Sequence, residues 1–92
     1  AAVFLGGERL VMNRGAEHLT GHPRNALRSI DAWFEALYPG RVAEVKALYL
    51  EDRAQGFPEP RVVPLRRADG EMRWVSFSGS MSDLGEFWVM HD

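Results

Sequence analysis

Residues 64–75 have the sequence PLRRADGEMRWV, which is the pattern of two strands joined by a tight turn. Asp69-Gly70 is a strong two-residue hairpin signal, because glycine tolerates the positive φ that such turns require. After the turn, residues 72–82 alternate with the period of two that is typical of a strand. We therefore predict an antiparallel pair of strands at residues 60–67 and 72–82.

Three further strands are predicted outside this hairpin. Short apolar runs place them at residues 3–5, 9–12 and 86–91, with a glycine turn between the first two. Over residues 41–54, apolar residues instead recur at helical spacing, which predicts an amphipathic helix of about four turns. The order of two strands, several helices and three strands indicates an α+β fold.

Shorter helices are predicted before the long one. Asn13 is a favoured N-cap for a helix at residues 14–20, because its side chain can accept the free N–H groups of a first helical turn. Ala26-Leu27 begins another short helical piece, and Ser29 or Asp31 is suited to cap the helix that follows it. The predicted connection between the two halves of the sheet is therefore mostly helical.

Length and composition describe one globular domain. The chain has 92 residues, of which 46% are hydrophobic and 26% charged, and its net charge is −2. So small a net charge creates only a weak electrostatic field, which does not favour nucleic acid as a partner. No apolar run approaches the roughly 20 residues that cross a bilayer, so we expect no direct membrane contact. The absence of cysteine favours a reducing, cytoplasmic compartment.

Four segments, taken in order, resemble the PAS family of sensory domains. They are residues 10–21 with their LTG ending, residues 33–39 with W followed by LYP, residues 64–75 with RRADGEMRWV, and residues 89–92, where Asp92 is similar to the opening of the family's D-I-T end. The chain departs from the family at residues 38–41, where an acidic pair is missing. The resemblance implies a PAS fold: a five-stranded antiparallel sheet with helices packed on one face.

The resemblance also implies a role in bacterial signalling rather than catalysis. We expect residues 1–92 to be a single PAS domain and a fragment of a larger multidomain protein. It would bind a small ligand in the helix–sheet cleft and relay a conformational change to a C-terminal output domain. That output domain would be a histidine kinase, a cyclic-dinucleotide enzyme or a transcription regulator. The alternative is a ligand-free PAS module that serves dimerisation and signal relay only.

The residues that PAS relatives use for cofactors are missing. Flavin and thioester chromophores of such relatives need a reactive Cys, and haem-binding relatives usually offer a His from the long helix, whereas residues 41–54 contain none. We therefore expect no haem, no flavin and no metal. The serines at residues 76–80 recur at period two and form a polar stripe rather than a supply of nucleophiles. Arg66, Arg67 and Arg73 form a basic patch that we interpret as solvated strand surface.

Two groups of residues are candidate functional sites. The first would line a pocket between helices and sheet, or would simply be core: Phe34, Val45, Leu48, Tyr49, Phe77 and Trp88. The second follows from strand alternation, because either Phe87 or Trp88 must point away from the helices. The predicted dimer and relay face comprises Trp74, Phe87 and Val89, since large exposed apolar patches usually mark interfaces. We expect a homodimer through this face and flanking helices.

Overall fold

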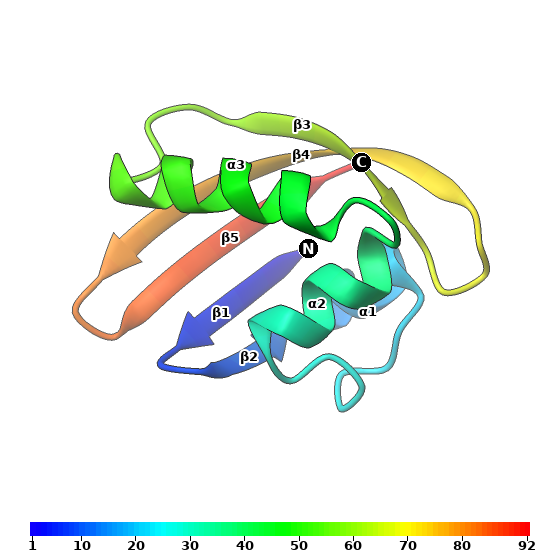
Figure 1. The fold of residues 1–92 in the computed structure, drawn as a ribbon. Coiled ribbons are helices and arrows are strands. Elements are labelled where there is room, and N and C mark those ends of the chain that lie inside the picture. The colour runs from blue at the N-terminus through cyan, green and yellow to red at the C-terminus, as the bar shows by residue number, and fades with distance from the viewer.

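Five antiparallel strands form one sheet in the order β2-β1-β5-β4-β3, and all the helices lie on one of its faces (Figure 1). The computed structural model describes residues 1–92. The strands are β1 (Ala2–Gly6), β2 (Arg9–Met12), β3 (Arg61–Arg66), β4 (Met72–Ser82) and β5 (Gly85–His91), and the helices are α1 (Arg14–Thr20), α2 (Ile30–Leu37) and α3 (Val42–Ala54). The predicted α+β class, the five strands and the long helix are confirmed.

Two local predictions differ from the structure. The loop between β3 and β4 is longer than two residues, because Arg66 pairs with Met72. Its turn is closed by the Gly70 N–H, which donates to the Arg67 carbonyl, and Gly70 has a φ of 88°. This is the hairpin geometry in which glycine follows the turn rather than lying inside it. Residues 26–27 are not helical: the chain makes a single turn there and then leads Leu27 into the core.

Asn13 holds two elements together at the start of α1. Its side-chain oxygen accepts from the Ala16 N–H at 2.9 Å, which caps the helix, and from the Ala2 N–H at 3.0 Å, which fixes the start of β1. At the other end Gly21 closes the helix with a φ of 74°, a conformation that suits glycine. The sequence-based prediction of this cap is confirmed, and the second bond extends its role to the sheet.

Replacing Asn13 with Ala is expected to lower the free energy of unfolding by about 1–2 kcal/mol, because both N–H groups lose their acceptor. Urea unfolding of the variant and the parent measures this difference. Asn13→Asp keeps an acceptor oxygen and is the matched control, so it should unfold close to the parent. An Ala variant as stable as the Asp variant would show that the cap contributes nothing.

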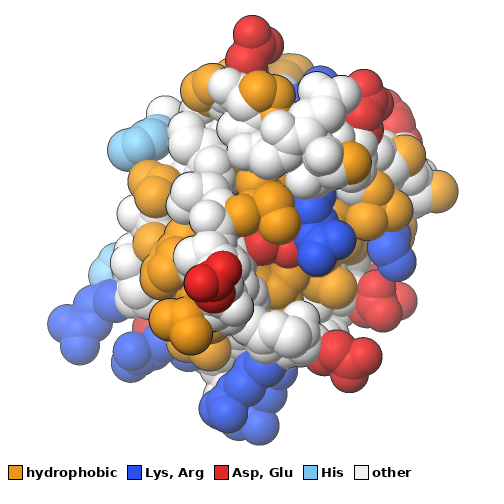
Figure 2. Space-filling view, turned by 90° about the vertical axis from the view of Figure 1, so that its left-hand side faces the viewer, with side chains coloured by type: hydrophobic (Ala, Val, Ile, Leu, Met, Phe, Trp, Pro, Cys, Tyr) orange, Lys and Arg blue, Asp and Glu red, His pale blue; other side chains and the backbone are white.

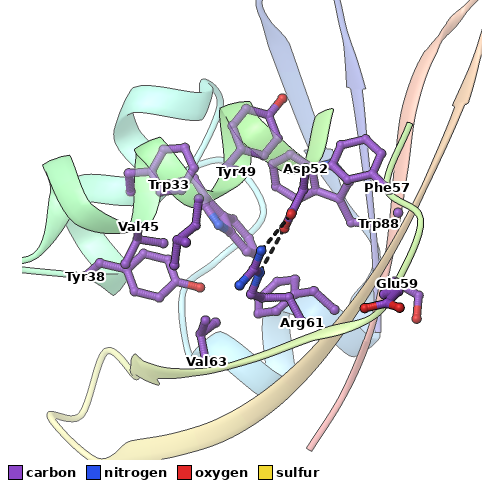
Figure 3. A pocket seen from close by; sticks show the side chains of 15 residues that line it. Trp33, Tyr38, Val45, Tyr49, Asp52, Phe57, Glu59, Arg61, Val63 and Trp88 are labelled. Carbon is purple, nitrogen blue, oxygen red and sulfur yellow. Dashed lines mark hydrogen bonds and ion pairs between the residues drawn. The ribbon is translucent and has the colours of Figure 1, made fainter. Parts of the chain in front are cut away.

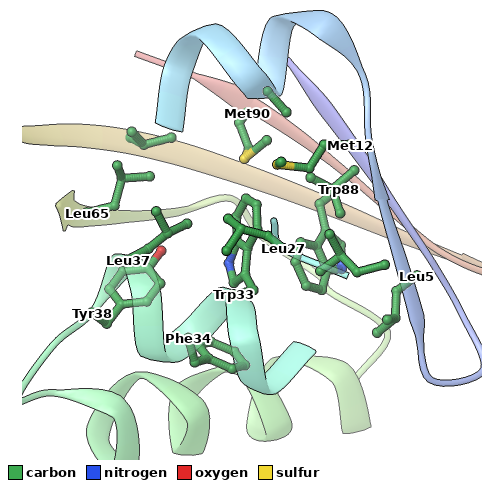
Figure 4. Packing of buried hydrophobic residues seen from close by; sticks show 14 of the residues in the cluster. Leu5, Met12, Leu27, Trp33, Phe34, Leu37, Tyr38, Leu65, Trp88 and Met90 are labelled. Carbon is green, nitrogen blue, oxygen red and sulfur yellow. The ribbon is translucent and has the colours of Figure 1, made fainter. Parts of the chain in front are cut away.

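The core lies between the inner face of the sheet and the helices (Figure 4). Cross-strand pairs share a face, so Trp88 and Met90 of β5 point to the same side as Val3 of β1. Trp33 of α2 meets Trp88 edge-on, with ring centroids 5.6 Å apart. α1 lies over β1 and β2, whereas α3 crosses the part of the sheet formed by β3, β4 and β5 (Figure 1).

None of the three helices has the length and apolar character needed to cross a membrane.

Candidate functional site

A cavity of about 80 Å³ lies between α2 and α3 on one side and β3, β4 and β5 on the other (Figure 3). Its wall combines aromatic side chains with a few charged ones: Trp33, Phe34, Tyr38, Val45, Leu48, Tyr49, Asp52, Phe57, Glu59, Arg61, Val63, Phe77, Ser78, Gly79 and Trp88. All six residues that the sequence suggested as pocket lining lie in this wall. The cavity is smaller than the several hundred Å³ of most ligand sites, so it has room only for a small molecule.

α3 stands off the sheet instead of packing closely on it. Val45 is its only buried residue, whereas Leu48 and Tyr49 are half-buried. The space beneath the helix is filled mainly by aromatic rings around Tyr49, whose ring centroid lies 5.6 Å from those of Phe34 and Trp88. A helix that is held mostly by long side chains can shift at lower cost than one embedded in the core.

Glu86 is the buried charge of the site, with only 4% of its surface exposed. The hydroxyl of Tyr49 donates to one of its oxygens at 2.7 Å, and Arg53 Nε donates to the other at 2.7 Å. Trp88 Nε1 also donates to Glu86, at 3.3 Å. Two residues of α3 are therefore anchored to β5 through one carboxylate. No local sequence pattern indicates this cluster, because Arg53 and Tyr49 lie 33 and 37 residues from Glu86 along the chain.

A second ionic contact joins α3 to β3. Arg61 donates from two nitrogens to the two carboxylate oxygens of Asp52, at 2.9 and 2.7 Å (Figure 3). This hydrogen bonding raises the pKa of Arg61 above its usual value, and the neighbouring carboxylates of Glu51 and Glu59 act in the same direction. The pair is partly exposed. Asp52, Glu59 and Arg61 therefore form the charged rim of the cavity.

Phe57 closes part of the cavity in an unusual backbone conformation. Its φ is 56°, the only positive value at a residue other than glycine, and such positions cost about 1–3 kcal/mol. Its ring lies directly on Gly79 of β4, where an added Cβ would approach the ring to 2.5 Å. Gly79 thus makes room for Phe57. This long-range fit could not be seen in the sequence.

Tyr38 contributes to the cavity wall a hydroxyl that makes no hydrogen bond within the protein. The residue is buried, with 4% of its surface exposed, and Figure 3 shows its hydroxyl directed toward the interior of the site. Burial raises the pKa of the phenol well above its ordinary value, and the nearby charge of Arg41 lowers it by a smaller amount. His22 Nε2 is the only fully buried side-chain nitrogen or oxygen without a partner, so the hydroxyl oxygen of Tyr38 keeps some access to solvent.

The raised pKa of Tyr38 predicts a loss of stability in alkali. Above about pH 10 an unfolded tyrosine ionises while buried Tyr38 stays protonated, so the folded state binds more protons and stability falls as pH rises. The contribution is as much as about 1.4 kcal/mol per pH unit. Urea unfolding at several pH values should show a shallower decline for Tyr38→Phe, with Tyr49 still present. Equal declines in parent and variant would contradict the assignment.

The outer face of the sheet carries the other candidate residues. Trp74, Phe87 and Val89 are 66%, 48% and 42% exposed, and Phe87 rather than Trp88 is the aromatic residue that points outward. Phe87 packs on Phe4 of β1, with centroids 4.8 Å apart. Leu84, in the turn before β5, is the most exposed large apolar residue. Figure 2 shows one end of the molecule, where apolar and charged side chains are interspersed.

The basic patch and the histidines do not build a site. Arg67 donates to the carbonyls of His18 and Leu19, so it fixes the end of α1, and it also pairs with Asp69. Arg73 pairs with Glu71 and with Asp92. No group of three or more histidines and carboxylates lies together in a way that could hold a metal ion.

This architecture is the PAS fold: a five-stranded antiparallel sheet in the order β2-β1-β5-β4-β3, with helices and a cavity on one face. The chain is similar over 99% of its length to the N-terminal domain of a diguanylate cyclase with PAS/PAC sensor from Marinobacter aquaeolei, covering 92% of that chain at 16% identity with a TM-score of 0.79. The PAS domain of a GGDEF family protein from Chromobacterium violaceum aligns over 100% of this chain and 94% of its own at 17% identity, with a TM-score of 0.46. The PAS resemblance is confirmed at the level of the fold. No protein-family model and no curated protein matches the sequence.

Proposed function

We propose that this domain is a sensory module that binds a small ligand in the cavity beneath α3 and passes the resulting change to a neighbouring domain. The observation that carries the proposal is the way α3 is held. One buried residue and two ionic contacts hold it to the sheet, and Lys46 pairs with Asp31 of α2. The contact between Asp52 and Arg61 borders the space that a ligand would occupy, and so does Tyr49, which donates to Glu86. An occupant that alters the position of Tyr49 or Asp52 therefore acts on α3 directly.

The route from α3 to the rest of a larger protein would run through β5. Glu86 lies at the start of this strand, and Asp92 follows its end. The Met90 N–H donates to the Ala1 carbonyl, so the two ends of the domain lie side by side. A shift of β5 would thus reach the segments on both sides of the domain. The solved structure with the higher similarity comes from a diguanylate cyclase, which makes a cyclic-dinucleotide enzyme the output domain that we favour.

A ligand shifts such an equilibrium only by its differential affinity for the two states. Native mass spectrometry of the protein purified from its own host tests whether one is retained. We expect a complex heavier than the polypeptide by one small molecule, which is lost on unfolding. A mass equal to that of the polypeptide alone, across growth conditions that alter signalling, would contradict the proposal.

The second candidate function is a ligand-free module for dimerisation and relay, which the exposed apolar outer face favours. Trp74, Phe87 and Val89 lie on a face that no helix of this chain covers. Sedimentation of protein extended at both ends should show a dimer at about 100 μM, well above the micromolar Kd of a modest interface. Phe87→Ser should weaken it. A strict monomer at that concentration would exclude this function.

A further inference from the structure

The charges at the rim of the cavity are unbalanced. Arg61 is the only cation there, and the carboxylates of Asp52, Glu51 and Glu59 all act on it. Glu86 and Arg53 neutralise each other within their own pair. The rim therefore has an excess of negative charge beside a wall that is mostly aromatic.

The uncharged part of the wall suits a compact apolar group with a positively charged end. Aromatic faces attract cations within about 6 Å of the ring centroid, by about 0.5–2 kcal/mol depending on exposure. Tyr49 precedes Asp52 in the sequence and Phe57 follows it, and both rings line the cavity. Their ring centroids are 6.1 Å apart. The unpaired hydroxyl of Tyr38 can accept a hydrogen bond from an N–H group. At about 80 Å³, the cavity has room for only a few heavy atoms.

We infer that the ligand of this cavity is a small organic cation, a protonated amine whose apolar body lies against the aromatic wall and whose ammonium group takes the place of Arg61 beside Asp52. This inference rests on the proposed ligand-binding function and specifies the chemistry of the ligand. An ammonium group placed at the rim keeps partial contact with water, so it avoids the full cost of burying a charge. Arg61 would then be released as the amine binds.

Three probes with one carbon skeleton test the charge. 3-Methylbutylamine is a cation at pH 7, 3-methyl-1-butanol is neutral and 3-methylbutanoate is an anion. We expect the amine to bind about tenfold more tightly than the alcohol in calorimetric or NMR titrations, with the carboxylate weakest. Its affinity should fall as salt is added. Equal binding of amine and alcohol would overturn the cation inference and leave the ligand-binding function standing. Binding of none of the three would overturn the inference as well, and native mass spectrometry would then decide the proposed function separately.

Two variants distinguish the effect of removing a charge from the effect of breaking the ion pair. Asp52→Asn and Arg61→Gln break the same ion pair, so each loosens the contact between α3 and β3. For a cationic ligand their effects on binding are opposite. Asp52→Asn should weaken binding of 3-methylbutylamine by about tenfold, whereas Arg61→Gln should leave it unchanged or tighten it, since Asp52 is then free.

The reverse pattern would show that Arg61 holds an anion and would overturn the inference. A loss of amine binding in both variants would also overturn it, because the ion pair itself would then be what the site requires. Thermal unfolding of both variants checks that they fold to a similar extent. Glu59→Gln, at an exposed position of the rim, should weaken binding of 3-methylbutylamine by a smaller factor than Asp52→Asn does.

Discussion

Replacing Trp33 with Ala is expected to lower the free energy of unfolding by about 3–5 kcal/mol. Trp33 is 1% exposed and packs edge-on against Trp88, so its removal leaves a large void between α2 and the sheet. Domains of this size have total stabilities of about 5–15 kcal/mol, so the variant should be partly unfolded at 37 °C or close to it. Urea unfolding followed by far-UV circular dichroism measures the change.

Trp74→Ala is the matched control for this experiment. Trp74 lies on the outer face of β4 and is 66% exposed, so the same substitution should change the free energy of unfolding by no more than about 0.5 kcal/mol. The two tryptophans thus distinguish the inner from the outer face. If both variants lost the same stability, the assignment of the two faces would be wrong.

Val45→Asp should unfold the domain or destabilise it by several kcal/mol, because an unpaired carboxylate would enter the buried side of α3. Leu48→Asp should have a smaller effect, since Leu48 is half-buried beside the cavity and its replacement can reach water. Thermal unfolding followed by circular dichroism measures the stability of each of these variants.

Leu50→Asp places the same charge on the same helix at a residue that is 50% exposed. This variant should have a melting temperature close to that of the parent, and so it controls for the change in helix propensity. Cooperative melting of Val45→Asp within a few degrees of Leu50→Asp would show that α3 presents a different side to the sheet.

The elements of this fold could be predicted because their signals are local. Strand alternation, helical spacing and the cap at Asn13 each lie within a few residues of chain. Alternation on β5 also showed that one of Phe87 and Trp88 points outward. It could not show which, because the choice depends on Glu86, whose burial is possible only where Tyr49 and Arg53 supply hydrogen bonds.

The candidate site could be predicted only in its apolar part. Phe34, Phe77 and Trp88 are large and apolar, so the sequence placed them between helices and sheet, and they line the cavity there. The groups that would select a ligand were missed. The pair of Asp52 and Arg61 depends on how α3 crosses β3, a contact set by tertiary packing rather than by any local pattern.

Methyl NMR during titration tests most directly whether the cavity beneath α3 is a binding site. The probes are 3-methylbutylamine and the alcohol and acid of the same skeleton. Methyl groups of Val45, Leu48 and Val63 line the cavity, whereas those of Val62 and Val89 lie on the outer face. We predict that at least one probe shifts the cavity methyls and leaves the outer ones unchanged. Shifts confined to the outer face would contradict the account, and no shift with any probe would overturn the inference that the cavity takes a small organic cation.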